Sequence, residues 1–359
     1  MIYKSGLEKN IISLIQEDIK LRGSKAIFNE AFWNWKYKNN NVDFYPNWII
    51  LAKSKKEDKI VGHYTVIPVK FMANGNKILA AQSVDTLTQL NYRGHGIFTV
   101  LAKRCYNQLA IDEVDLIFGY PNDSSHPGFI RKLNWLDLFE VKELAYPLNH
   151  KKVVKLKFSN PLMRIFGNLY LYNKYSFLNF TRGKYKKYSF KIQDLKEFKI
   201  DIKIIREWLN KKYKYYVDRI IEYLTWRYLK NPIDKNVIIK SFHKGEELKG
   251  FYALKIKSYP HKSGLIIGHI MELLSDVEDE ITIQYMLNDI VKSSNERKVD
   301  ILHIYTHKEQ HDYNILKKFG FMKFDKKHFI IRINKNVDKY QGIKSARNWY
   351  ISLGDSDRA

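Results

Sequence analysis

The residues best suited to chemistry follow the strand-like segment Val84 to Thr88. The sequence continues into Arg93-Gly94-His95-Gly96, and an amphipathic helical pattern begins at Ile97. Glycines lack a Cβ atom, so the backbone can turn tightly and come close to a ligand. Successive N–H groups at the start of a helix point into one concavity, where the helix dipole favours an anion. The segment therefore predicts a cradle for phosphate or pyrophosphate.

The elements that must position this cradle follow from the apolar spacing. Strands are predicted by four apolar, β-branched runs, at residues 48–52, 60–69, 78–87 and 114–118. Asn74-Gly75 predicts a hairpin turn, and the helical spacing of apolar residues over 96–110 predicts a helix with one apolar face. Cys105 falls on that face, so we interpret its thiol as a small buried hydrophobic group. A shorter helix is expected at residues 128–133.

Four landmarks recur in the same order in the two halves of the chain. The matching pairs are Trp35-Lys36-Tyr37 with Trp226-Arg227-Tyr228, Gly62 with Gly250, Val114-Asp115 with Val299-Asp300, and residues 129–135 with residues 315–321. Their offsets all lie between 185 and 191 residues. Nearly constant spacing over four landmarks indicates a duplicated domain.

Composition and charge narrow the class of protein. The 359 residues carry a net charge of +24, and 13 of the Lys and Arg residues fall within 151–200, against Asp194 and Glu197. Such charge is typical of proteins that bind nucleic acid, an anionic membrane or a phosphorylated molecule. The apolar content of 45% excludes a disordered chain, and the single cysteine excludes an intrachain disulfide or a four-cysteine zinc site. No apolar run reaches the roughly 18 residues of a spanning helix, and no signal peptide is expected.

The glycine motif and the duplication together make the chain resemble the GNAT superfamily of N-acyltransferases. It resembles most the subgroup in which two such domains follow one another in one chain. The acyl-CoA motif of that family, Gln/Arg-x-x-Gly-x-Gly/Ala, aligns with Asn91 to Gly96, with Asn at the first position. The fifth strand and the next helix of the family resemble Gly119 to Trp135. There Asn134-Trp135 replaces the usual Gly-Phe, which the second half keeps as Gly320-Phe321.

The resemblance implies acetyl-CoA, or another acyl-CoA, as cosubstrate. Backbone amides of residues 93–98 would hold its pyrophosphate, and its pantetheine arm would pair with the backbone near the end of the preceding strand. We add Asn122, just past the next strand, as a candidate for the pantetheine or the acceptor. The cofactor residues are thus Leu87, Thr88, Arg93, Gly94, His95, Gly96, Ile97, Phe98 and Asn122. In the second half the equivalent stretch, Leu274 to Glu280, is acidic and has no glycine, so we expect one CoA site.

Catalytic residues do not transfer from the family, because its general-acid Tyr corresponds to Ile130 here. We infer three substitutes from the residues themselves. Asp85 is a base or an amine-binding carboxylate, unless neighbouring N–H groups satisfy it structurally. His126 has the pKa range of a base, although a loop histidine is often only solvated. Asp355 lies in a C-terminal segment that begins apolar and aromatic, and packing of this segment would place Asp355, Asp357 or the terminal carboxylate at a specific point. No metal is expected.

The predicted fold class is α/β, in the sense of α+β: two tandem GNAT-like domains, each with a mixed, mostly antiparallel sheet flanked by helices. The predicted boundaries are 1–148 for the domain with the acyl-CoA cradle, 149–200 for a basic aromatic connector, 201–335 for a degenerate GNAT-like domain and 336–359 for a C-terminal tail.

The resemblance implies a transferase in which an amine attacks the thioester of an acyl-CoA directly. A nucleotide-linked amino sugar for surface polysaccharide is the best hypothesis for the acceptor, and a cytoplasmic location follows. Two alternatives stay open: a peptidoglycan aminoacyltransferase that uses aminoacyl-tRNA, whose binding the positive charge would help, and a non-catalytic CoA- or membrane-binding protein. The sequence does not indicate an oligomeric state.

Aromatic and basic residues alternate over residues 161–190. Three interpretations remain: a segment resting on anionic lipid at the inner face of the membrane, a surface that stacks nucleic-acid bases, and a connector whose aromatic residues pack between domains.

Overall fold

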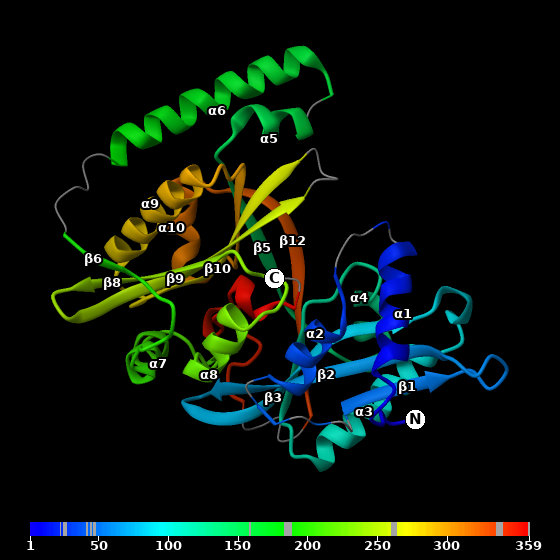
Figure 1. The fold of residues 1–359 in the computed structure, drawn as a ribbon. Helices are drawn as coiled ribbons and strands as arrows, with labels where there is room; N and C mark the ends of the chain where they lie inside the picture. The colour runs from blue at the N-terminus through cyan, green and yellow to red at the C-terminus, as the bar shows by residue number, and fades with distance from the viewer. Residues whose placement is uncertain are drawn as a thin grey trace. The chain divides into compact units, whose positions relative to one another are not determined.

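The structure is a computed structural model that describes residues 1–21, 23, 27–40, 42–43, 45, 48–157, 159–182, 189–259, 264–334 and 340–357 (Figure 1). The chain divides into two compact units, and each takes segments from both halves of the sequence. Unit 1 comprises Met1–Glu140, Lys214–Lys235 and Lys327–Trp349, and unit 2 comprises Val141–Tyr213, Asn236–Lys326 and Tyr350–Ala359.

Unit 1 is built on a sheet with the strand order β1-β2-β3-β4-β12. β3 and β4 run parallel, and the other neighbours run antiparallel. The strands are β1 (Ile49–Lys53), β2 (Ile60–Ala73), β3 (Asn76–Thr88), β4 (Leu116–Gly119) and β12 (Met322–Ile333), with β7 (Tyr215–Val217) beside β2. Asn74 and Gly75 join β2 to β3 with φ of 50° and 78°, the left-handed backbone of a two-residue hairpin. The predicted strands of the first half and the hairpin are confirmed.

Helices on the unit 1 sheet follow the predicted apolar spacing. They are α1 (Glu8–Leu21), α2 (Glu30–Trp33), α3 (Ile97–Ile111), α4 (His126–Leu133) and α8 (Ile221–Leu224), with the short segments η1 (Asn34–Lys38), η3 (Leu90–Tyr92), η5 (Thr225–Leu229) and η7 (Ala346–Asn348). α3 buries Leu101, Ala102, Cys105 and Leu109 in the core, as expected. Burial raises the pKa of the Cys105 thiol, so the interpretation of Cys105 as a buried hydrophobic group holds.

Unit 2 has the strand order β5-β11-β10-β9-β8-β6, with β10 and β11 parallel. Its strands are β5 (Leu136–Pro147), β6 (Lys191–Asp194), β8 (Val237–Lys244), β9 (Glu247–Tyr259), β10 (Leu265–Ser275) and β11 (Ile301–Thr306). The unit boundaries cut two strands: β5 belongs to unit 1 up to Glu140, and β12 belongs to unit 2 up to Lys326. Its helices are α5 (His150–Lys157), α6 (Pro161–Arg182), α7 (Ile202–Asn210), α9 (Glu280–Glu296) and α10 (His311–Phe319), with the short segment η8 (Leu353–Asp355). α9 and α10 lie together on one face of this sheet (Figure 1).

The segment 149–200, expected as a connector, forms α5, α6 and β6 within unit 2. α6 has 22 residues. Among the residues that the structure describes, no helix combines the length and apolar character needed to cross a bilayer.

The first repeat landmark forms a reciprocal pair inside unit 1. The indole rings of Trp35 and Trp226 stack with centroids 4.8 Å apart and an interplanar angle of 16°. Each indole N–H donates to the backbone carbonyl of the other residue, at 2.8 Å in both directions. Both tryptophans lie in a five-residue π-helical segment, η1 and η5, directly after a short α-helix. Two sequence-related segments thus meet in equivalent conformations, which supports the duplication.

Other landmarks keep the same structural role in their own units. A Cβ atom on Gly62 would lie 3.1 Å from Ile97 of α3, and one on Gly250 would lie 2.9 Å from Thr282 of α9. Glycine therefore lets the long helix approach the sheet closely in each unit. Asn134 ends α4 with φ of 55°, and Gly320 ends α10 with φ of 113°, as expected if Asn134-Trp135 takes the place of Gly-Phe.

The two halves also exchange strands. β12, from the second half, pairs with β4 in unit 1, whereas β5, from the first half, pairs with β11 in unit 2. Apart from β6 at the edge, the strand order of unit 2 therefore repeats the five-strand order of unit 1, with one strand in each supplied by the other half. The predicted domain boundaries follow the sequence halves and stay a prediction, because the compact units cross them.

Candidate functional site

The loop between β3 and α3 has the backbone of a ligand cradle. Gly94 and Gly96 adopt φ of 86° and 73°, and a Cβ atom on either would meet nothing within 4 Å. Glycine is therefore required here by the backbone conformation and not by a lack of space. Gly96 is the residue before α3, and its carbonyl accepts the first helical hydrogen bond, from the N–H of Val100 at 3.1 Å.

The N–H groups of this loop are open. Among the described residues, no group accepts a hydrogen bond from the N–H of residues 94 to 98, and the loop is exposed at Gly94, His95 and Gly96. The positive end of the α3 dipole adds to these donors. Arg93 is held against the strand end, because its Nε donates to the Thr88 carbonyl at 3.0 Å and its guanidinium lies 3.3 Å from Asp18. The predicted cofactor residues 93–98 thus form one cationic turn that suits a phosphate group.

β3 and β4 separate beside this turn. Their parallel pairing runs from Ala80↔Leu116 to Gln82↔Phe118, and β3 then continues alone on that edge to Thr88. Within this stretch β3 bulges against β2, and Asp85 adopts φ of 44°. Leu87 and Thr88 remain paired with β2. The open β3 edge next to the cradle is the place where the resemblance expects the pantetheine arm.

α4 begins close to the cradle. A Cβ atom on Gly128 would lie 2.9 Å from the ring of Phe98, the second residue of α3. The rings of Phe98 and Phe129 are also in edge contact, with centroids 5.2 Å apart. The start of α4, which carries His126, is therefore packed against the first turn of α3.

Asn122 sets the turn that leads into α4. Its side-chain oxygen accepts from the Ser125 N–H at 2.9 Å, and its carbonyl accepts from the His126 N–H at 2.9 Å. These two hydrogen bonds close a turn over residues 122–126. It gives Asn122 a structural task in placing His126, and a contact between Asn122 and a cofactor stays a prediction.

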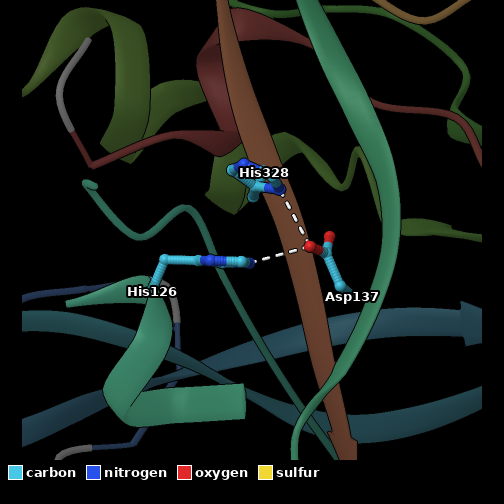
Figure 2. A group of neighbouring side chains, drawn as sticks. All are labelled: His126, Asp137 and His328. Atoms are coloured by element: carbon cyan, nitrogen blue, oxygen red, sulfur yellow. Dashed lines mark hydrogen bonds and ion pairs between the residues drawn. The ribbon is translucent and has the colours of Figure 1, made fainter. Parts of the chain in front are cut away.

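His126 belongs to a cluster of three side chains in unit 1, shown in Figure 2. His126 Nε2 lies 2.8 Å and His328 Nδ1 lies 2.9 Å from the same carboxylate oxygen of Asp137. The two imidazole rings stack with centroids 4.0 Å apart, and the side chains are between 20% and 34% exposed. A carboxylate accepts from both rings, which leaves His126 Nδ1 as the unprotonated nitrogen of the neutral ring.

This cluster has the composition of a proton-accepting site. Among the described residues, no group donates to His126 Nδ1, so that nitrogen can take a proton from a bound amine or from water. The three atoms that could ligate a metal, one from each residue, lie within 4.8 Å of one another, which is close enough for a divalent cation. His126 Nε2 and His328 Nδ1 already donate to Asp137, so a cation would have to replace these two hydrogen bonds. Sequence patterns suggested His126 alone, because Asp137 and His328 lie in strands without a motif.

Asp85 is held as an anion. Its carboxylate accepts from Lys36 Nζ at 2.6 Å and from the Tyr37 hydroxyl at 2.5 Å. Burial alone would raise the pKa of Asp85, but the Lys36 charge and the hydrogen bonds from Lys36 and Tyr37 outweigh it and hold the pKa below its ordinary value. The Trp35-Lys36-Tyr37 landmark is therefore in direct contact with Asp85 of β3. The geometry favours a structural anion, and a catalytic role for Asp85 stays a prediction.

Asp355 lies in unit 2, whereas the cradle lies in unit 1. It is 4% exposed, and its carboxylate accepts from the Ser352 N–H at 2.9 Å in a capping box that starts η8. This task in the C-terminal segment is structural, and a catalytic role for Asp355 stays a prediction.

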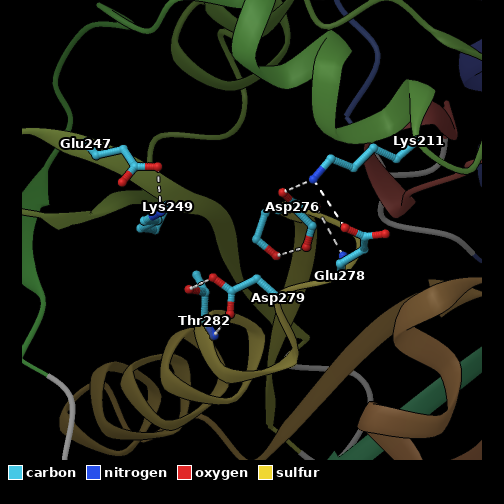
Figure 3. Close-up of polar contacts among 8 residues, drawn as sticks. Lys211, Glu247, Lys249, Asp276, Glu278, Asp279 and Thr282 are labelled. Carbon is cyan, nitrogen blue, oxygen red and sulfur yellow. Dashed lines mark hydrogen bonds and ion pairs between the residues drawn. The ribbon is translucent and has the colours of Figure 1, made fainter.

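The equivalent turn of unit 2, between β10 and α9, is acidic (Figure 3). Asp279 caps α9 by accepting from the Thr282 N–H at 2.9 Å. Asp276 and Glu278 both contact Lys211 Nζ, at 2.5 Å and 3.3 Å. Side-chain carboxylates thus occupy the helix start that is open in unit 1.

Comparisons with known proteins agree with this geometry. Residues 22–136 match the family model of the acetyltransferase (GNAT) domain, and a comparison with curated proteins found no match. Among solved structures, the N-myristoyltransferase of Saccharomyces cerevisiae with bound myristoyl-CoA has a TM-score of 0.60 at 12% identity, covering 93% of this chain and 77% of that chain.

Two bacterial structures are similar to the same extent. A GCN5-related N-acetyltransferase from Anabaena variabilis has a TM-score of 0.59 at 11% identity, covering 94% of this chain and 73% of that chain. A probable N-acyltransferase from Enterococcus faecalis has a TM-score of 0.58 at 14% identity, covering 93% and 72%. These likenesses agree with the predicted class of enzyme, an N-acyltransferase. Residues 22–136 thus match the acetyltransferase (GNAT) domain, and nearly the whole chain is similar in fold to these N-acyltransferases.

Proposed function

We propose that unit 1 transfers an acyl group from acyl-CoA to the amine of a small acceptor. The open turn at the start of α3 carries this proposal. Its N–H groups from residue 94 to residue 98 have no acceptor among the described residues, and such a helix start binds a phosphate group well. The GNAT domain match over residues 22–136 supports acyl-CoA as the source of that phosphate, and acetyl-CoA is the simplest donor.

The donor would lie along the separation of β3 from β4. The pyrophosphate contacts the amides of residues 94–98, and the Arg93 guanidinium adds positive charge beside it. The pantetheine arm then follows the free edge of β3 beyond Gln82, where backbone groups are available for strand-like hydrogen bonds. This path brings the thioester toward the end of β4, from which the chain leads through Asn122 to His126.

The chemistry requires a neutral amine and an acceptor for its proton. The amine nitrogen attacks the thioester carbon, so that a C–N bond forms and the C–S bond breaks. His126 Nδ1 takes the proton that the nitrogen loses, directly or through water, and Asp137 orients the ring and stabilises the imidazolium. The thiolate of CoA leaves and takes up a proton. The products are an amide and free CoA.

For the acceptor we propose a nucleotide-linked amino sugar used for surface polysaccharide, modified in the cytoplasm. Its pyrophosphate suits a chain with a net charge of +24. The same charge also suits tRNA, so an aminoacyl-tRNA-dependent transferase is the competing function. The open cradle favours acyl-CoA, because an aminoacyl-tRNA donor does not use it.

A binding experiment separates these functions. Thermal unfolding followed with rising acetyl-CoA must shift to higher temperature, since a ligand at 100 times its Kd stabilises the native state by about 2.7 kcal/mol. Release of CoA thiol that depends on an added amino sugar nucleotide would then establish the acceptor class. No shift at millimolar acetyl-CoA, together with tRNA binding that survives physiological salt, would favour the competing function.

A further inference from the structure

α6 of unit 2 exposes apolar side chains along one face. We define the α6 apolar face by the residues Leu162, Ile165, Phe166, Leu169, Tyr170 and Tyr172, each at least 56% exposed. At 100° per residue these positions fall within one half of the helix circumference. Exposed apolar residues are normally scattered, and a contiguous face of this kind marks an interaction surface.

The opposite face of α6 fixes the helix to unit 2. Leu171 and Tyr175 are buried in the unit 2 core, and the Tyr175 hydroxyl donates to the Gly320 carbonyl at 2.8 Å. α6 also packs along α5 (Figure 1). The α6 apolar face is therefore presented by an anchored helix.

The segment that carries this face is cationic. No Asp or Glu occurs from Lys151 to Gln193 in the sequence, whereas α5 alone carries four lysines. A protein partner for an apolar helix face would be matched by mixed polar groups at the rim. An apolar face with aromatic residues on a cationic segment instead matches the chemistry of an anionic lipid surface.

A cavity beside the α6 apolar face offers room for a lipid headgroup. It has a volume of about 680 Å³, and its lining includes Lys151, Lys298, Asn168 and Tyr172. Asp300 also lines the cavity, where its carboxylate lies 2.9 Å from Lys152 Nζ. Tyr172 lines the cavity and also belongs to the α6 apolar face, so the two are continuous. The side-chain oxygen of Asn168 is buried, and among the described residues no group donates to it. The lysines suit a phosphate, and the amide oxygen of Asn168 suits a headgroup hydroxyl.

We propose that unit 2 docks on an anionic phospholipid surface through the α6 apolar face, with one lipid phosphate in the cavity lined by Lys151 and Lys298. The apolar side chains insert between lipids at the level of the headgroups, and the lysines contact phosphate oxygens. This docking is independent of acyl transfer, because it needs neither acyl-CoA nor an amine. It would hold the chain that carries the transfer site at the membrane.

Cosedimentation of the full chain with vesicles tests the docking. We expect binding to phosphatidylcholine vesicles that contain phosphatidylglycerol, and at least about tenfold weaker binding to phosphatidylcholine alone, since each lysine near an anionic surface contributes roughly 1 kcal/mol. Equal binding to both vesicle types, or none to either, would overturn the proposal.

Two pairs of variants test whether vesicle binding depends on the α6 apolar face and the cavity lysines, or only on the general hydrophobicity and charge of the surface. Phe166→Glu with Leu169→Glu should abolish vesicle binding, whereas Ile111→Glu should not, although Ile111 is 72% exposed at the end of α3 in unit 1. Lys151→Glu with Lys298→Glu should weaken binding by about tenfold or more. Lys55→Glu with Lys56→Glu changes the net charge equally, in an exposed loop of unit 1, and should have little effect.

Other occupants of the surface would give different results. If inorganic phosphate bound to the chain but anionic vesicles did not, the cavity would hold a free anion, and the lipid assignment would be wrong. If the chain were a dimer in light scattering and Phe166→Glu with Leu169→Glu made it a monomer, the face would bind a second copy. Either result overturns the proposal.

Discussion

The turn from β3 to α3 and the turn from β10 to α9 occupy the same place in the two halves, but they present opposite charge. The first has two left-handed glycines and open N–H groups. In the second, Asp279 accepts from the first turn of the helix, and Asp276 and Glu278 stand beside it. Both turns still connect a strand to a long helix that packs closely over a glycine. The fold can thus be kept while the anion site is lost, because the packing residues and the binding residues are different.

The largest expected effect concerns the first turn. Gly94→Asp should abolish the stabilisation by acetyl-CoA and reduce acyl transfer to background, because it places a carboxylate where the pyrophosphate belongs. Gly75→Asp is the matched control, since Gly75 has a similar φ of 78° and open space but lies in the β2–β3 hairpin. Thermal shift and thiol release measure both variants. Equal loss in the two variants would mean that backbone strain, and not the cradle, is responsible.

The next largest effect should be on kcat and should come from the cluster at the start of α4. His126→Ala should lower kcat by about 10² to 10⁴, the usual contribution of a general base, while the shift with acetyl-CoA is retained. Asp137→Asn should lower kcat less, since the ring loses only its orienting carboxylate. Steady-state kinetics at saturating acetyl-CoA measure both. An unchanged kcat in His126→Ala would remove the cluster from the mechanism.

The reciprocal Trp pair should show that the two halves depend on each other for stability. Trp35→Ala should lower the free energy of unfolding by about 3–5 kcal/mol, as for other large buried aromatic residues. Trp226→Ala should do the same, and the double variant should cost less than the sum, because each indole donates to the other residue. Chemical denaturation measures these values. Simple additivity would contradict a coupled pair.

The smallest expected effect is a pH dependence from His311, which begins α10. Burial, with Lys212 and His307 nearby, lowers the pKa of His311 to about 3. The unfolded chain therefore binds this proton near pH 6.5 and the folded chain does not. Its contribution to stability is complete above pH 6.5 and is lost as the pH falls, by about 2 kcal/mol between pH 6.5 and 5.

His311→Gln should flatten this part of the pH profile of stability, measured by denaturation at each pH. His95→Gln, in the exposed cradle loop, is the control and should keep the slope of the unsubstituted chain. A slope unchanged in His311→Gln would show that the folded protein accommodates the charged ring.

Local patterns in the sequence were enough to predict the cradle and the elements around it. The hairpin at Asn74-Gly75, the α3 face and the glycine turn each depend on neighbouring residues. The cluster of His126 could not be predicted, because Asp137 on β5 and His328 on β12 come from different halves of the sequence and meet where β12 also pairs with β4. That pairing exchanges strands between the halves, and β5 and β12 follow equivalent helices in the repeat, so no pattern indicates which would be chosen.

The most direct test counts acetyl-CoA sites. Isothermal titration of the full chain with acetyl-CoA should give one site per chain, and Gly94→Asp should remove it, because only the turn before α3 keeps its glycines. Two sites per chain, or one site that persists in Gly94→Asp, would contradict the account.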